Sequence, residues 1–142
     1  MTKMSREQFP YVGQIIRKKK VITANDISKF IEISGDSNPV HLDDSYARKV
    51  GYKARIAHGF ISISLFSGMF GTDVPGEGSI YVEQNVRFLK PVYLDEEILA
   101  VATVLKISQR SNIVVFRTEC FGAVDMERKL SGQAKILMAG QR

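Results

Sequence analysis

The chain has few side chains that hold metals or form covalent bridges: among its 142 residues there are one Cys and two His. A single Cys cannot form an internal disulfide, which suits a reducing compartment. Cys120 lies in the apolar stretch 114–124, where we expect it to be a small buried hydrophobic side chain and not a nucleophile. One Cys and two His are also too few for a typical zinc site, so we expect no bound metal.

Long apolar runs are missing as well. No run approaches the roughly 18 residues that span a bilayer, and residues 1–10 lack the apolar core of a secretory signal. We therefore expect a cytoplasmic protein that has no membrane partner. The length fits one domain with its own core, so we predict a single domain over residues 1–142, of which residues 1–11 form a loosely ordered N-terminal segment.

The charge is basic, with a formal net charge of +5 and a pI near 9.4, but it lacks the architecture of a nucleic-acid binder. The only basic run, residues 17–20, is flanked by Ile and Val and has no interleaved aromatic residues. No recognition helix or zinc-finger pattern accompanies it, so we expect no nucleic-acid partner. Two interpretations remain: lysines that protect an exposed strand edge, or a rim that attracts an anionic ligand.

The order of predicted elements indicates an α+β fold. A strand over 12–22 precedes a helix over 24–34, which starts with a capping-box-like pair, Thr23 and Asp26, and stops at Gly35. A short helix follows from Asp43 or Asp44 through Lys49. Residues 59–71 are apolar on nearly every helical face, which is typical of a buried helix. The last half alternates as four strands: 79–90, 97–108, 112–122 and 128–138. We predict a curved antiparallel sheet wrapped around one long buried helix.

The bend between the first two helices, residues 35–41, contains the most informative pattern. Asp36 and His41 are five residues apart, so neither a continuous helix nor a strand would point both side chains at one atom. Pro39 interrupts any helix, and Asp36 and Asn38 are residue types that hydrogen-bond their own backbone in turns. The sequence therefore predicts a compact bend that can aim a carboxylate and an imidazole into one cavity.

This bend is part of a wider resemblance that covers roughly residues 12–138. The chain resembles the MaoC-like (R)-specific enoyl-CoA hydratases in these runs, taken in order: Ser34-Gly35-Asp36, Asn38-Pro39-Val40-His41 and Ala47, Ile56-Ala57-His58-Gly59, and the segments 75–81 and 86–92. The resemblance implies a hot-dog fold and a homodimer with its active site near the subunit interface. It also implies reversible hydration of a trans-2-enoyl-CoA, with no metal and no cofactor, because coenzyme A is part of the substrate.

The resemblance also implies roles for individual residues. Asp36 and His41 match the catalytic pair, and Asn38 lies in the same bend. Gly59 matches the residue whose backbone N–H receives the thioester oxygen. The remaining matches are Ser67, a helix serine that hydrogen-bonds within the site, and Phe88, which lines the acyl pocket.

For three residues near these matches we expect structural roles. We expect His58 to position the backbone, and Ser62 and Ser64 to bond back to helix carbonyls. Two alternative functions stay open: a hot-dog acyl-CoA thioesterase, and a non-catalytic dimer that binds acyl thioesters. An acyl-carrier protein is a possible thioester donor in place of coenzyme A.

Overall fold

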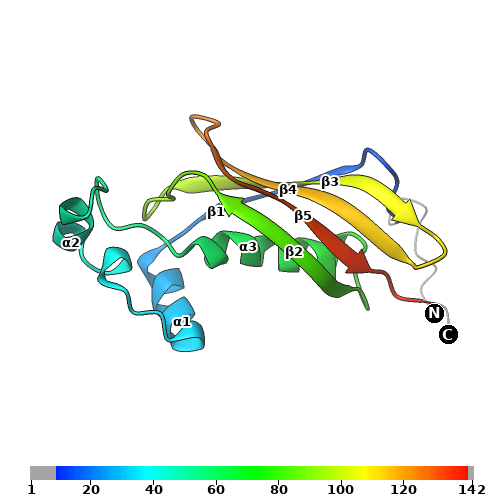
Figure 1. Cartoon of the computed structure of the whole chain (residues 1–142), viewed down its shortest axis with the longest axis horizontal. Helices are drawn as coiled ribbons and strands as arrows, with labels where there is room; N and C mark the ends of the chain where they lie inside the picture. Colours follow the sequence, from blue (N-terminus) through cyan, green and yellow to red (C-terminus); the bar gives the residue numbers. More distant parts are fainter. Residues whose placement is uncertain (1–8, 141–142) are drawn as a thin grey trace.

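The computed structural model describes residues 9–140, so the predicted N-terminal segment falls largely outside the described part of the chain. Within these residues, five strands and three α-helices follow one another, and Figure 1 shows how they are arranged. The strands are β1 (Ile15–Val21), β2 (Ile80–Phe88), β3 (Glu97–Ser108), β4 (Ile113–Gly122) and β5 (Arg128–Leu137). The helices are α1 (Ala24–Ser34), α2 (Asp44–Lys49) and α3 (Gly59–Gly68), and a short 3-10 turn, Pro39–His41, lies between α1 and α2.

One antiparallel sheet in the order β1-β3-β4-β5-β2 forms the body of the molecule. Along β4, and along β3 as far as Val104, every second side chain is buried, because successive side chains of a strand point to opposite faces. The helix α3 runs along the buried face, and α1 and α2 extend past one end of the sheet (Figure 1). The predicted antiparallel sheet with a central helix, the hot-dog arrangement, is confirmed.

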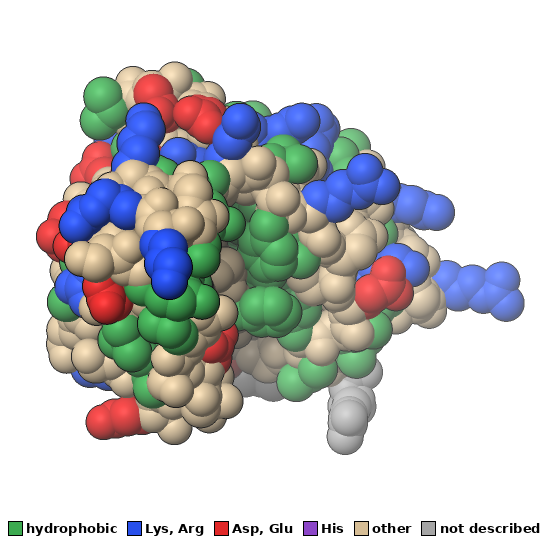
Figure 2. Space-filling model, turned by 60° about the vertical axis from the view of Figure 1, so that its left-hand side comes forward, with side chains coloured by type: hydrophobic (Ala, Val, Ile, Leu, Met, Phe, Trp, Pro, Cys, Tyr) green, Lys and Arg blue, Asp and Glu red, His purple; other side chains and the backbone are tan. Residues whose placement is uncertain are grey.

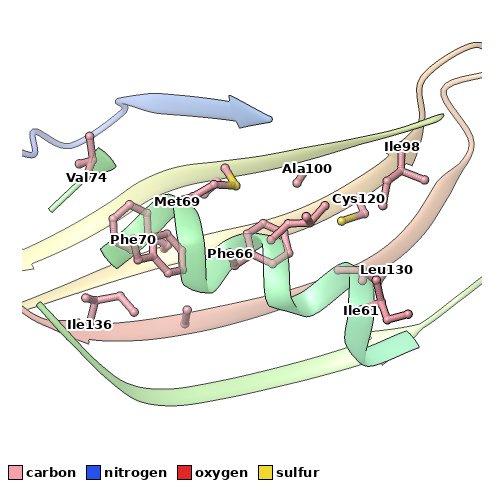
Figure 3. Close-up of a cluster of buried hydrophobic side chains, with 14 of the residues drawn as sticks. Ile61, Phe66, Met69, Phe70, Val74, Ile98, Ala100, Cys120, Leu130 and Ile136 are labelled. Carbon is pink, nitrogen blue, oxygen red and sulfur yellow. The ribbon is translucent and has the colours of Figure 1, made fainter. Parts of the chain in front are cut away.

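The hydrophobic core lies between α3 and the sheet, as Figure 3 shows. Phe66 and Phe70 are at most 1% exposed, and the ring of Phe70 packs against Phe116 of β4 at a centroid distance of 4.3 Å. Cys120 is fully buried in this core, and burial raises the pKa of its thiol to about 12. The prediction of a buried, unreactive Cys120 agrees with this position.

The expectation of a helix buried on all sides holds for only part of α3. Phe60 is 62% exposed, and Ser64 and Ser67 on the same helical face are exposed too. The sheet of one chain covers only the opposite face. At its C-terminal end the helix also continues as a π-helical turn, Met69–Asp73, beyond the predicted stop at residue 71.

Local signals in the sequence fix the boundaries of the other elements. Thr23 and Asp26 form the predicted capping box of α1, Gly35 ends that helix at φ 74°, and Asp43 caps α2. The basic run 17–20 lies on β1, an edge strand of the sheet, where Lys20 pairs with Asp26 at 3.0 Å. Among the described residues, no helix has the length and apolar character that a membrane crossing requires.

Candidate active site

The predicted bend exists, and its own polar groups hold it. The N–H of Gly35 donates to Ile31 O (2.8 Å) and so closes α1. One carboxylate oxygen of Asp36, Oδ1, accepts the backbone N–H of Asn38 (3.1 Å), and the side-chain oxygen of Asn38 accepts the N–H of Val40 (3.1 Å). These Asx-type hydrogen bonds satisfy the backbone where Pro39 prevents a helix. Asn38 therefore builds the bend through its side chain.

The bend brings Asp36 and His41 together. Oδ2 of Asp36, the oxygen that the bend does not use, lies 3.8 Å from Nε2 of His41. The imidazole of His41 is buried, whereas the carboxylate of Asp36 is about half exposed (49%). On its other side, Nδ1 of His41 lies 2.8 Å from the carbonyl oxygen of Ile56. A carbonyl oxygen only accepts, so Nδ1 carries the hydrogen and Nε2 of the neutral ring is left as the basic nitrogen.

The surroundings of His41 favour its neutral form. Burial is the largest cause that lowers the pKa of His41 below its ordinary value of 6.5, and the neighbouring His58 lowers it further. The hydrogen bond to Ile56 and the carboxylate of Asp36 act in the opposite direction but do not outweigh burial. His41 is therefore an unprotonated base at neutral pH.

His58 belongs to the same cluster, although sequence reasoning gave it only a backbone-positioning role. Its Nε2 lies 2.9 Å from the backbone oxygen of Asp36 and 3.9 Å from Oδ2 of the same residue. Its ring stacks on that of His41 with a centroid distance of 3.7 Å and an interplanar angle of 28°. Two sequence signals point to His58: its adjacency to Gly59 at the start of an apolar helix, and its place in the run Ile56-Ala57-His58-Gly59.

Gly59 begins α3, and its position depends on the absence of a side chain. The ring of Phe88 occupies the place where a Cβ of residue 59 would lie. His58 caps the helix without a side-chain hydrogen bond, so the first turn directs N–H groups and the positive end of the helix dipole outward. A ligand oxygen can approach this backbone closely.

A cavity of about 330 Å³ lies at this helix start. Three of the predicted site residues, His41, Gly59 and Phe88, line it, and so does His58. Asp36 and Asn38 lie in the adjoining bend and are not among the lining residues. The complete lining is His41, Tyr52, Ile56, Ala57, His58, Gly59, Phe60, Ser62, Phe88, Leu89, Lys90, Pro91, Val92, Lys129 and Leu130.

The serines of α3 lie differently from what the sequence led us to expect. Ser62 lines the cavity and is 2% exposed, whereas Ser67 lies on the exposed face of α3 and outside the lining. Ser64 bonds back to the carbonyl of Ile61 (2.5 Å), as expected. Within the single chain, Ser62 is therefore the α3 serine that lines the cavity. The predicted role of Ser67 stays a prediction.

The cluster also contains the residue types of a metal site. One ligand atom each from Asp36, His41 and His58 lies within 4.8 Å of the others. However, Nε2 of His58 already donates to a backbone carbonyl, so it has no lone pair to offer a cation in this arrangement. The geometry is that of a hydrogen-bonded acid–base cluster, and the expectation of a metal-free site stays a prediction.

Comparisons with known proteins agree with this architecture. A family model described as "MaoC like domain" matches residues 12–122. The (R)-specific enoyl-CoA hydratase of Rhodospirillum rubrum is 36% identical over 126 residues, which cover 89% of this chain and 86% of that protein. The mitochondrial 3-hydroxyacyl-[acyl-carrier-protein] dehydratase of Arabidopsis thaliana is 37% identical over 129 residues, covering 89% of this chain and 76% of that protein.

A solved structure is similar as well. The (R)-hydratase from A. caviae involved in PHA biosynthesis superposes with a TM-score of 0.87 at 32% identity, covering 91% of this chain and 97% of that one. Similarity of sequence and of structure thus extends over nearly the whole chain, including the bend and α3. The chain belongs to the family of MaoC-like domains.

Proposed function

We propose that this protein is an (R)-specific enoyl-CoA hydratase, which adds water reversibly across the double bond of a trans-2-enoyl-CoA to give an (R)-3-hydroxyacyl-CoA. The observation that carries this proposal is the convergence of Asp36 and His41 on the start of α3 at Gly59, beside one cavity. The relatives that bear hydratase and dehydratase names support the reaction class and the (R) configuration.

The hydration step needs a base for water. The 3.8 Å between Nε2 of His41 and Oδ2 of Asp36 is too long for a direct hydrogen bond and suits one water that bonds to both. His41 takes a proton from this water, and the water oxygen attacks the β-carbon of the enoyl group. General acid–base help of this kind contributes about 10² to 10⁴-fold.

The second requirement is a place for negative charge, because attack at the β-carbon converts the thioester carbonyl into an enolate. We assign the backbone N–H of Gly59 as its hydrogen-bond donor, supported by the dipole of α3. The proton taken from water then returns through the Asp36–His41 pair to the α-carbon. One water is added in total, so the overall reaction balances without a redox or group-transfer cofactor, and we propose that it proceeds without a metal.

The acyl chain of the substrate and its coenzyme A moiety need different surroundings: apolar walls for the chain and positive charge for the phosphates. Phe88, Ile56 and Leu130 give the cavity apolar walls for an acyl chain. Lys90 lines both this cavity and a neighbouring outer groove, and it forms no ion pair within residues 9–140. Lys129 also lines both, but Glu96 pairs with it at 3.0 Å. We therefore assign Lys90 to the phosphates of coenzyme A. An acyl-carrier protein, named for the Arabidopsis relative, is the second possible carrier.

The homodimer expected from the sequence is also part of the proposal. β2 is an edge strand with unpaired backbone groups, and Ile80, Val82 and Phe88 on it are at least half exposed. Phe60 of α3 adds to this surface, and its ring lies 6.0 Å from that of Phe88. Hydrophobic side chains gather beside a hollow in one face of the molecule in Figure 2. Exposed apolar patches of this kind typically mark interfaces, and a second copy on this surface would place the site near the subunit boundary.

We also propose that the protein acts in the cytoplasm.

One reaction with the wild-type protein tests the function. On addition of crotonyl-CoA we expect the absorbance of the enoyl thioester to fall without release of free thiol, and the product to be the (R)-3-hydroxy thioester. Thiol release in place of hydration would identify the thioesterase alternative. Tight binding without turnover would identify the non-catalytic alternative, and either result would overturn the proposal.

A truncated substrate tests the assignment of Lys90. Lys90→Ala should raise KM for crotonyl-CoA and leave KM unchanged for a crotonyl thioester that lacks the phosphates. Lys106→Ala is the matched control, because Lys106 is an exposed lysine of β3 that lies outside both the cavity and the outer groove and forms no ion pair within residues 9–140. An equal effect of Lys90→Ala on both substrates would refute the assignment.

A further inference from the structure

Each histidine of the site donates a hydrogen bond to a backbone carbonyl in the segment that carries the other histidine. His41, in the bend, donates from Nδ1 to the carbonyl of Ile56, which precedes α3 (2.8 Å). His58, at the start of α3, donates from Nε2 to the carbonyl of Asp36 in the bend (2.9 Å). Both acceptors are carbonyl oxygens, so the hydrogen positions follow from the geometry. In their neutral forms the two rings are opposite tautomers.

This tautomer makes His58 unsuitable as a second base. Its only basic nitrogen, Nδ1, is buried and has no hydrogen-bond partner among the described residues, and the whole side chain is 3% exposed. The fixed N–H on Nε2 is thus the one polar function that His58 offers to the site.

The ring of His58 is held in place from two sides. Phe30 of α1 contacts it at a centroid distance of 4.7 Å, and His41 stacks on the opposite side at 3.7 Å. A positive charge on one stacked imidazole disfavours a charge on the other. The other charged groups that face His41 are the carboxylate of Asp36, 3.8 Å away, and the lysines 90 and 129, which line the same cavity.

We propose that His58 is a positioning residue: its Nε2–H hydrogen bond clamps the bend onto the start of α3 and so holds the carboxylate of Asp36 opposite Nε2 of His41. This inference rests on the proposed hydratase function for its kinetic consequences only. The carbonyl that accepts the bond belongs to Asp36 itself, so a loss of the bond moves the carboxylate directly. A displacement of a catalytic group by about 1 Å lowers the rate by roughly 10²-fold.

Two substitutions separate the hydrogen bond from the ring. His58→Gln keeps an N–H donor near the position of Nε2 and loses the stack, whereas His58→Phe keeps the stack and loses the donor. We expect His58→Phe to lower kcat by roughly 10²-fold with little change in KM, and His58→Gln to stay within about threefold of wild type. Full kcat in His58→Phe, or an equal loss in both folded variants, would overturn the proposal.

Nitrogen NMR tests the clamp without any turnover, and it decides the case if His58→Phe does not fold. The chain has only two His, so protein labelled with 15N-histidine gives two ring systems, both from the site. In mildly alkaline buffer we expect one Nδ1–H and one Nε2–H tautomer, and the Nε2–H signal should disappear in His58→Gln. Two rings of the same tautomer would refute the clamp. A wild-type protein with opposite tautomers that fails to hydrate crotonyl-CoA would instead refute the proposed function alone.

Discussion

Replacing Gly59 by Ala tests the geometry of the proposed oxyanion site most sharply. A Cβ at residue 59 would lie 2.8 Å from Cδ1 and 3.0 Å from Cζ of Phe88, whereas carbon atoms in ordinary contact are about 3.5 to 4.0 Å apart. The ring must therefore move by about 1 Å. A misplacement of this size in an active site costs roughly 10²-fold in rate.

The same substitution should change stability little. Phe88 lines the cavity, so its ring can shift into open space at little cost. Gly59 is the first residue of α3, where an added Cβ gains less than the roughly 0.5–1 kcal/mol by which Ala is better than Gly in a helix interior. We expect the free energy of unfolding of Gly59→Ala to stay within about 1 kcal/mol of wild type, or about 4 °C in Tm. The value of kcat/KM for crotonyl-CoA should fall by about 10²-fold, measured by the loss of enoyl-thioester absorbance.

A double-mutant cycle with Phe88→Ala identifies the cause of that loss. In the Phe88→Ala background the added Cβ meets no ring, so Gly59→Ala should then cost less than about threefold in kcat/KM. If Gly59→Ala costs the same factor in both backgrounds, the loss comes from the backbone and not from the ring. Full activity of Gly59→Ala with Phe88 present would refute the close approach itself.

Other predictions follow from the bend and the helix termini. Because burial lowers the pKa of His41 below 6.5, the acidic limb of kcat/KM should have its midpoint below that value. Between the lowered pKa and pH 6.5, the unfolded chain binds more protons at His41 than the folded chain does. The stability contributed by neutral His41 is therefore full above pH 6.5 and declines as the pH falls through the lowered pKa. Urea unfolding midpoints measured across this pH range will test the decline. Gly35 has φ 74°, so Gly35→Ala should destabilise by about 1–2 kcal/mol. Gly68→Ala, at φ −63° in α3, should instead stabilise by about 0.5–1 kcal/mol; destabilisation by both would contradict the conformational reasoning. Thr23→Ala removes the cap of α1 and should cost about 1 kcal/mol, measured by thermal unfolding, and an unchanged Tm would show that the capping box contributes nothing.

The sequence was most informative where a local rule decides the structure. The capping box at Thr23 fixes the start of α1, and Gly35 fixes its end. The Asx-type bonding of Asp36 and Asn38 follows from residue type and from Pro39. The high content of Ile, Val, Thr and Leu likewise predicted a strand at residues 97–108, as observed for β3.

The sequence was less informative where tertiary packing decides. Residues 59–71 are apolar on nearly every face, so periodicity could not show which side of α3 meets the sheet. The resemblance assigned Ser67 to the site, whereas within one chain Ser62 lines the cavity. The hydrogen bond from His58 to Asp36 joins residues 22 positions apart, and no local pattern encodes it.

The central claim is that Asp36 and His41 carry the chemistry, and the turnover of crotonyl-CoA by His41→Gln and Asp36→Asn tests it most directly. Both variants should fold, as circular dichroism will show, and both should lose about 10² to 10⁴-fold in kcat relative to wild type. Wild-type turnover in both folded variants would contradict the claim.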